Sequence, residues 1–247
     1  MKLSEIFDQL TYGELSQLNL GGGEAGAINE SNYKQIVAHV NMGLLALYKR
    51  FPLKGNSINL SLQSGRFSYP LHSKYAVSNT ASTEPVKYIL DTVDDPFTDD
   101  LFKVESVLTE SDWELGLNDD SDYYACSTPS ANVLRVPADI VMVSPDLPDQ
   151  LRTTYLEINY RASHPVIVLG DTPDIDAIEL ELPYSHLEPL LLYIASRVNN
   201  PIGMTNEFHA GNSYAAKYEQ ACQQLETFNL NVDQGSQNTR LEKNGWV

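Results

Sequence analysis

Residues that build metal sites and disulfide scaffolds are scarce in this sequence. Its 247 residues include 2 cysteines and 5 histidines, and no two histidines lie four residues apart or beside a cysteine, the spacings typical of zinc sites. Cys126 stands in a strand-like stretch and Cys222 in a helix-like one, so we expect two buried free thiols rather than a disulfide. The sequence therefore predicts no metal site and no cofactor.

Basic residues are scarce as well. The chain has 16 Lys and Arg against 33 Asp and Glu, a formal net charge of −17. Proteins that bind nucleic acids broadly, or anionic membranes, present a basic face, so this balance disfavours both classes. It remains compatible with a protein that lets DNA pass without gripping it. Residues 91–122 hold twelve of the acids and one base, Lys103, and so carry eleven of the seventeen net negative charges.

Long apolar runs are missing. The longest, Leu190–Ala195, is far shorter than the roughly 20 residues that a membrane-spanning helix needs. Glu5 and Asp8 interrupt any apolar signal-peptide core near the start. We therefore expect a soluble chain that is unprocessed at its start and has no membrane partner.

The motifs of common enzyme classes are also absent. No G-x-S-x-G stretch supports a hydrolase nucleophile elbow, and Gly21-Gly22-Gly23 lacks the following Gly-Lys-Ser/Thr of a phosphate-binding loop, so we interpret it as a flexible connection. The acidic runs 94–100 and 119–122 lack the ligand order of an EF-hand, which favours solvated loops over calcium sites. We therefore expect no catalytic residue.

Both ends of the sequence show the apolar period of amphipathic helices. The capping box Ser185-x-x-Glu188 starts one of them, and Pro52 and Pro201 follow two helix ends. Each helix has a one-sided apolar face that it cannot bury alone, so the two ends of the chain are expected to meet in one helical bundle, formed by 1–52 and 183–230. The predicted helices cover residues 3–18, 29–51, 185–198 and 206–228.

The middle of the chain alternates apolar and polar residues, the period of strands. Short strands separated by Asn, Asp, Ser, Gly and Pro clusters, with no helical pattern between them, predict an antiparallel sandwich or barrel-like domain inserted at 53–182. The expected fold class is therefore α+β, with the strand order left open. The predicted strands cover residues 57–62, 66–69, 101–108, 113–117, 133–136, 155–160 and 178–182.

The tail, 231–247, has almost no apolar residues before Trp246 and Val247. It cannot bury enough apolar surface to order itself. Two interpretations stay open: a disordered end, or an extended C-terminal arm that folds against another molecule with Trp246 as its anchor.

Three stretches resemble the head-to-tail connector, or adaptor, proteins of short-tailed (podovirus-like) bacteriophages, which attach below the portal ring. Together they cover about half of the chain, and the β insert is not matched by any motif. They are Leu3-Ser4-Glu5-Ile6 with the helix containing Asn32-Tyr33-Lys34-Gln35-Ile36-Val37; Tyr160-Arg161-Ala162-Ser163-His164-Pro165, which leads through Leu182-Pro183 to Leu190–Arg197; and Tyr214-Ala215-Ala216-Lys217-Tyr218 followed by Leu225.

The resemblance implies a structural virion protein rather than an enzyme. It implies a homo-oligomeric ring, usually of twelve copies, whose helical bundles surround a channel through which genomic DNA passes without specific binding. The C-terminal arms would reach the portal protein, and the other end would receive tail or nozzle proteins. The implied location is the virion, at the junction of head and tail, after synthesis in the host cytoplasm.

Two sets of residues are candidates for these contacts. The portal-binding arm would use Gln234, Asn238, Arg240, Lys243, Trp246 and Val247. The acidic lining of the channel or its mouth would use Asp94, Asp95, Asp99, Asp100, Asp119, Asp120 and Asp122.

Two alternatives remain. The β domain could form a tail-associated carbohydrate-binding module or depolymerase-like protein, with Trp113, Tyr123 and Tyr124 as a stacking platform beside the acidic loops. The chain could also be a tail tube or nozzle subunit.

Overall fold

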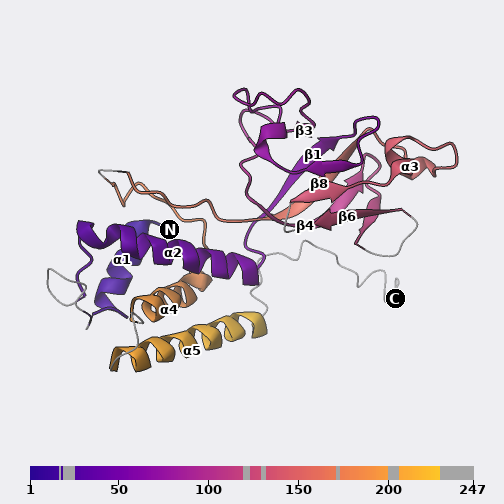
Figure 1. The fold of residues 1–247 in the computed structure, drawn as a ribbon. Coiled ribbons are helices and arrows are strands. Elements are labelled where there is room, and N and C mark those ends of the chain that lie inside the picture. The colour runs from indigo at the N-terminus through magenta and orange to yellow at the C-terminus, as the bar shows by residue number, and fades with distance from the viewer. Residues whose placement is uncertain are drawn as a thin grey trace. The chain divides into compact units, whose positions relative to one another are not determined.

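The computed structural model describes residues 1–16, 18, 26–118, 123–128, 132–170, 173–199 and 206–228, the first five residues of the last range as backbone only. The chain divides into two compact units. The helical unit consists of Met1–Leu53 and the chain from His164 onward, and the sheet unit of Lys54–Ser163. The protein is therefore a mixed α+β protein, as the two hydrophobic periods predicted (Figure 1).

Helices from both ends of the chain share the core of the helical unit. α4 contacts the other three helices, and Figure 1 shows α4 beside α2 and α5. Leu10 of α1, Leu44 of α2 and Leu190 of α4 are among its buried residues, as are Cys222 and Leu225 of α5. The four helices are α1 (Leu3–Tyr12), α2 (Glu30–Arg50), α4 (Leu187–Val198) and α5 (Asn206–Thr227).

Gly43 allows α2 and α4 to pack closely. A Cβ at this position would lie 2.7 Å from Cδ1 of Leu190 and 3.1 Å from Cδ1 of Tyr193, whereas carbon atoms in good contact are about 3.5–4.0 Å apart. Glycine inside a helix costs about 1 kcal/mol relative to alanine. The close packing that the missing methyl group permits offsets this cost.

The predicted capping box at the start of α4 is wrong. Residues Tyr184–His186 form a single 3₁₀ turn, η4, and α4 begins only at Leu187, without a side-chain cap. The hydroxyl of Ser185 lies 3.0 Å from Nδ1 of His186 instead of reaching the backbone of the first helical turn. Ser185 is therefore inside a turn, and a sequence pattern alone does not distinguish that from a helix cap.

The segment 164–182 packs with the helices, although the sequence assigned it to the β domain. Ile167 is buried in the helical core, and its backbone N–H and C=O bond to the side chain of Asn41 at 2.9 and 3.0 Å. The backbone N–H of Leu3 donates to the carbonyl of Ile178 at 2.9 Å. The predicted strand 178–182 is reduced to a bridge between Lys2 and Glu179, because the backbone bonds of this segment go to the N-terminus and to α2.

Eight strands form one curled sheet, a half-barrel, in the sheet unit. The strand order is β2-β7-β6-β5-β4-β8-β1-β3. Side chains of β8 alternate, so that Leu156, Ile158, Tyr160 and Ala162 are buried. The strands are β1 (Gly55–Ser61), β2 (Ser68–Pro70), β3 (Ile89–Leu90), β4 (Leu101–Thr109), β5 (Glu114–Leu117), β6 (Tyr124–Thr128), β7 (Val133–Arg135) and β8 (Tyr155–Ala162); between β7 and β8 lie the short helix α3 (Ala138–Val141) and the 3₁₀ turn η3 (Asp149–Leu151).

The single curled layer agrees with the barrel-like alternative of the prediction and not with the two-layer sandwich. It departs from the predicted antiparallel pairing where β5 and β6 pair in parallel, with Gly116 opposite Tyr124. β3, which has only two residues, was not predicted, and β6 was anticipated only as the strand-like stretch around Cys126, because it has no strong apolar alternation. Strands this short carry too little sequence pattern to determine their direction or their partners.

Side-chain contacts connect the two edges of the curled sheet. The hydroxyl of Tyr88, which precedes edge strand β3, donates to the carbonyl of Pro70 on edge strand β2 at 2.7 Å. The ring of Tyr69 meets the ring of Tyr88 edge-on at a centroid distance of 5.2 Å. Both tyrosines are fully buried, so the interior of the half-barrel is closed at this side by aromatic contacts rather than by strand pairing.

Candidate functional site

Asp91 fixes the start of the acidic loop in the sheet unit. Its carboxylate accepts hydrogen bonds from the backbone N–H of Ser78 at 2.8 Å, from the Ser78 hydroxyl, and from the backbone N–H of Phe97 at 2.9 Å. Burial alone would raise the pKa of Asp91, but these hydrogen bonds hold it below its ordinary value. Asp91 therefore joins residues far apart in the sequence and is not available to an external partner.

Asp99 and Asp100, two of the predicted channel acids, are also bonded within the unit. Asp99 accepts from the backbone N–H and the hydroxyl of Ser73, both at 2.6 Å, and has a φ of 60°. Asp100 accepts from the Tyr160 hydroxyl at 2.9 Å. Burial, and then the charge of Asp100, raise the pKa of Tyr160. These two acids attach the loop to η1 (Ser73–Tyr75) and to β8.

Asp94 and Asp95 lie at the tip of the loop and are exposed, as Asp99 is, but they differ from it in their bonding. The loop tip is closed by the backbone N–H of Asp95, which donates to the Thr92 hydroxyl at 3.0 Å. Their carboxylates accept no hydrogen bond from the described residues, and Val93 beside them is 84% exposed. The structure thus separates these four acids into two whose carboxylates accept no hydrogen bond from the described residues and two whose carboxylates anchor the loop.

The remaining predicted site residues lie outside the described part of the chain. These are Asp119, Asp120 and Asp122 of the acidic set, and Gln234, Asn238, Arg240, Lys243, Trp246 and Val247 of the arm. Both assignments stay predictions.

The three aromatic residues of the alternative sugar-binding platform do not share one surface. Tyr124 is exposed at the start of β6, whereas Tyr123 packs against the core of the sheet, as expected for successive residues that point to opposite faces. Trp113 is 52% exposed and precedes Gly116, the partner of Tyr124, by three residues, or about 10 Å along a strand. A continuous stacking surface would need all three rings on one face.

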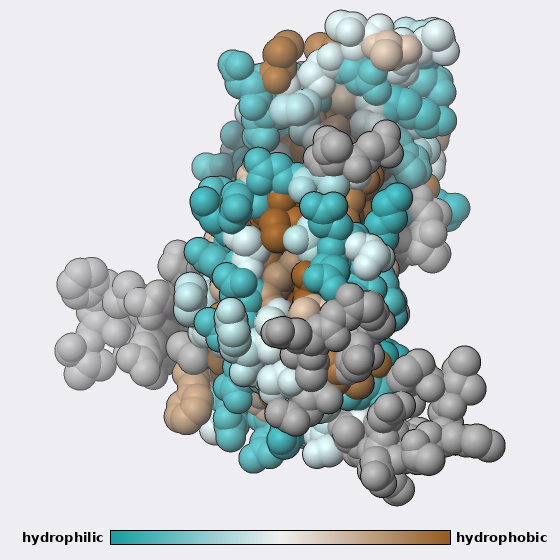
Figure 2. Space-filling model, turned by 90° about the vertical axis from the view of Figure 1, so that its left-hand side faces the viewer, coloured by the Kyte–Doolittle hydropathy of each residue, from teal (hydrophilic) through white to brown (hydrophobic). Residues whose placement is uncertain are grey.

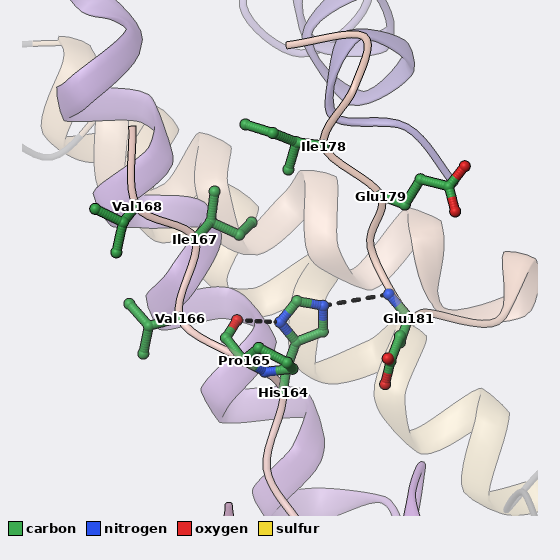
Figure 3. A pocket seen from close by; sticks show the side chains of 8 residues that line it. All are labelled: His164, Pro165, Val166, Ile167, Val168, Ile178, Glu179 and Glu181. Carbon is green, nitrogen blue, oxygen red and sulfur yellow. Dashed lines mark hydrogen bonds between the residues drawn. The ribbon is translucent and has the colours of Figure 1, made fainter. Parts of the chain in front are cut away.

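The helical unit contains a shallow pocket of about 210 Å³ between the two legs of the segment 164–181 (Figure 3). Figure 3 shows the ring of His164 between the two legs, with Val166 and Val168 pointing to the side opposite Ile167. The pocket is lined by His164, Pro165, Val166, Ile167, Val168, Ile178, Glu179 and Glu181.

His164 joins the two legs of this segment. Its Nδ1 lies 2.6 Å from the carbonyl oxygen of Pro165, and the backbone N–H of Glu181 donates to its Nε2 at 3.2 Å. A carbonyl only accepts and an amide N–H only donates, so both bonds form together in the neutral ring with its proton on Nδ1. The pocket's histidine therefore has a structural task that uses both of its nitrogen atoms.

Tyr48 supports the same segment from α2. Its ring meets the ring of His164 edge-on at 5.6 Å, and its hydroxyl donates to the carbonyl of Glu181. Burial, and then the charge of Glu181, raise the pKa of Tyr48 to about 12. No Ser, Thr, Cys or Lys is among the lining residues, and the contacts of His164 and Tyr48 hold the segment against the helices.

Two further histidines of the helical unit each have a buried ring nitrogen without a hydrogen-bond partner in the described structure. His186 is fully buried against Phe51, at a ring distance of 4.8 Å, and its Nε2 has no partner. Burial lowers the pKa of His186. Burial, and then the charge of Arg197, lower the pKa of His39, whose Nδ1 is also unpartnered. Both rings are therefore held neutral by their surroundings.

Other kinds of site find no support in the described residues. Cys126 and Cys222 are free thiols, and within the described ranges no three His, Cys, Asp or Glu residues are grouped so as to hold a metal ion. No helix in that part of the chain is long and apolar enough to cross a membrane. Compared with known proteins, the chain matches no protein-family model and no curated protein.

Proposed function

We propose that this chain is the adaptor subunit of a short-tailed bacteriophage, a structural protein that forms a ring between the portal and the tail. The observation that carries the proposal is the discontinuous helical unit: Met1–Leu53 and the chain from His164 onward share one core, and Lys54–Ser163 form a separate unit inserted between them. The resemblance in the helical segments implies this same arrangement of terminal helices around an insert.

In this proposal the four helices act as a bundle beside the DNA channel, and the sheet unit is the part that receives tail or nozzle proteins. Twelve copies would complete the ring. The helical unit suits this task because its core combines residues from both ends of the chain, so local opening of either end exposes apolar surface and is resisted.

The acidic charge supports passage of DNA without binding. Affinity for DNA rises with each phosphate that a protein neutralises, so a lumen of carboxylates repels the duplex and does not retain it. Asp94 and Asp95 are exposed on a loop fixed by Asp91, Asp99 and Asp100. We assign Asp94 and Asp95, with Asp119, Asp120 and Asp122, to the channel or its mouth.

The tail segment Gln234–Val247 is proposed as the arm that docks on the portal, with Trp246 as its anchor. Its polar composition suits a segment that orders on contact, because the entropy cost of ordering is then met only where the portal is present.

The test is assembly on the portal. Purified full-length chain mixed with portal rings should form a second, twelve-fold ring in electron micrographs. A variant that lacks Gln234–Val247 should fail to form this ring. The double variant Asp94→Asn, Asp95→Asn should assemble normally but release DNA more slowly from assembled particles.

A full-length chain that stays monomeric beside intact portal rings would contradict the proposal. Binding of that chain to glycans would favour the carbohydrate-binding alternative.

A further inference from the structure

The outer face of α1 combines an acid with an aromatic ring. Its inner face is buried through Leu3, Ile6, Phe7 and Leu10. One helical turn separates Asp8 and Tyr12, which are both exposed. Tyr12 is 85% exposed, the highest value among the large hydrophobic side chains in the described residues. The Asp8 carboxylate forms no ion pair or hydrogen bond there, so nothing within the described chain uses this face.

The outer face of α2 combines a base with aliphatic side chains. Met42 and Leu45 are 46% and 44% exposed, and Lys49 follows Leu45 by one turn. α2 contains three basic residues and one acid, in a chain of net charge −17. Arg50 is engaged by two glutamates of α5, whereas Lys49 is exposed and has no ion-pair partner in the described structure.

Hydrophobic side chains are also visible at the surface in the space-filling view. Figure 2 views the molecule from the side that lies on the left of Figure 1 and shows hydrophobic patches bordered by hydrophilic residues. Large exposed patches bordered by polar residues often mark sites of protein–protein contact.

We infer that α1 of one copy packs against α2 of the next copy in the ring, with Tyr12 on Leu45 and Asp8 on Lys49. The two pairs have the same spacing of four residues and opposite charge, so antiparallel helices bring both contacts together. This inference rests on the proposed function, because it names the contact between neighbouring copies of the proposed ring.

Charge explains why two different faces should meet. Copies with a net charge of −17 repel one another, so a stable contact must place a base against an acid. Lys49 facing the Lys49 of a second copy would add repulsion, which disfavours a two-fold contact of α2 with itself. A contact between two different faces can be heterologous, and a heterologous contact repeats from copy to copy and closes into a ring where the rotation between copies allows it.

A cross-linking experiment tests the contact in the full-length chain. The variants Tyr12→Cys and Leu45→Cys, each also carrying Cys126→Ser, are mixed and treated with a short bis-maleimide. Covalent heterodimers should form, and a chain that carries both new cysteines should give a ladder of oligomers. Ala216→Cys, exposed on α5, replaces Tyr12→Cys in the matched control, which should give only background. Equal yields from the two mixtures would overturn the inference.

Charge reversal separates a specific contact from a general loss of folding. Lys49→Glu should lower the yield of cross-linked heterodimer about tenfold or more, because like charges then face each other. Adding Asp8→Lys on the partner chain should restore it. Failure of this restoration overturns the inference. If rings form on the portal but Tyr12→Cys and Leu45→Cys do not cross-link, the inferred contact is wrong and the proposed function stands. If no ring forms, the proposed function is wrong, and the cross-link in solution still tests the contact by itself.

Discussion

The guanidinium group of Arg50 binds the carboxylate of Glu219 through two parallel hydrogen bonds, with Nη1 and Nη2 at 2.7 and 2.8 Å from the two oxygens. Its Nε donates to Glu226 at 2.6 Å. Arg50 lies in the last turn of α2 and both acids lie on α5, so one side chain connects the N-terminal helices with the last helix. Hydrogen bonds from Arg50 lower the pKa of Glu219 and of Glu226.

Replacing Arg50 with Gln should destabilise the helical unit. The forked pair is lost and two like charges on α5 remain without their cation. Solvent screens a pair of this exposure, so we expect the free energy of unfolding to fall by about 1 kcal/mol. Arg50→Lys should recover only part of the lost stability, because an ammonium group cannot form the two parallel hydrogen bonds.

The measurement is urea unfolding followed by the helical circular dichroism signal. Lys34→Gln, exposed on the same helix and without an ion pair in the described structure, is the control, and equal losses in both variants would contradict the role of the pair.

His186 and His39 should make the helical unit sensitive to mild acid. Burial lowers the pKa of His186 from its ordinary value of 6.5 in the folded state. As pH falls below 6.5, the unfolded chain takes up a proton that the folded chain takes up only at lower pH, so stability present above 6.5 is lost on acidification. The free energy of unfolding should therefore decrease between about pH 6.5 and 5, the interval set by the ordinary histidine pKa and the onset of carboxylate titration.

His186→Leu should reduce this slope without removing it, because His39 has a pKa shift of the same sign. The control is His72→Gln, since the His72 side chain is 46% exposed. An unchanged slope in His186→Leu would show that the buried ring at the start of α4 does not contribute.

Closure of the half-barrel should depend on one hydroxyl. Tyr88→Phe removes the hydrogen bond to the carbonyl of Pro70 while it keeps the ring that stacks on Tyr75 at 4.8 Å. Loss of a buried hydrogen bond costs about 1 kcal/mol, so the midpoint of urea unfolding of the sheet unit should fall. Tyr124→Phe, on the exposed side of β6, should leave it unchanged. If both variants unfold alike, the edges are held by ring packing alone.

The helices could be predicted from the sequence because their signal is local. In α2, Ile36, Val40, Leu44 and Leu47 repeat at the helical period and are all buried. The segment 164–182 could not be predicted in the same way, because the alternation at Ile178–Leu182 that predicted a strand instead places Leu180 and Leu182 in the helical core. Which partner an alternating segment finds is decided by residues far away in the chain.

The same limit applies to the acidic residues. Asp94 and Asp95 differ in no local way from Asp91, Asp99 and Asp100. The partners that distinguish them are 13 residues away for Asp91, 26 for Asp99 and 60 for Asp100. Sequence composition therefore predicted an acidic loop, and the packing of the sheet unit determines which of its acids are hydrogen-bonded to other segments.

Asp91 allows this division of the acids to be tested. Asp91→Asn keeps one acceptor oxygen, which cannot serve the Ser78 N–H, the Ser78 hydroxyl and the Phe97 N–H together. The Phe97 amide should then exchange its hydrogen about tenfold faster, since leaving a partly buried donor unpaired costs about 1–3 kcal/mol. Asp94→Asn should not change that rate.

Lowering the pH should have the same effect as the mutation. The hydrogen bonds hold the pKa of Asp91 below its ordinary value, so the bonds are fully present when the pH is above that ordinary pKa. They are lost as the pH falls through the lowered pKa of the folded state. Slow exchange at Phe97 in Asp91→Asn would mean that the loop is held by other contacts and that Asp91 does not anchor it.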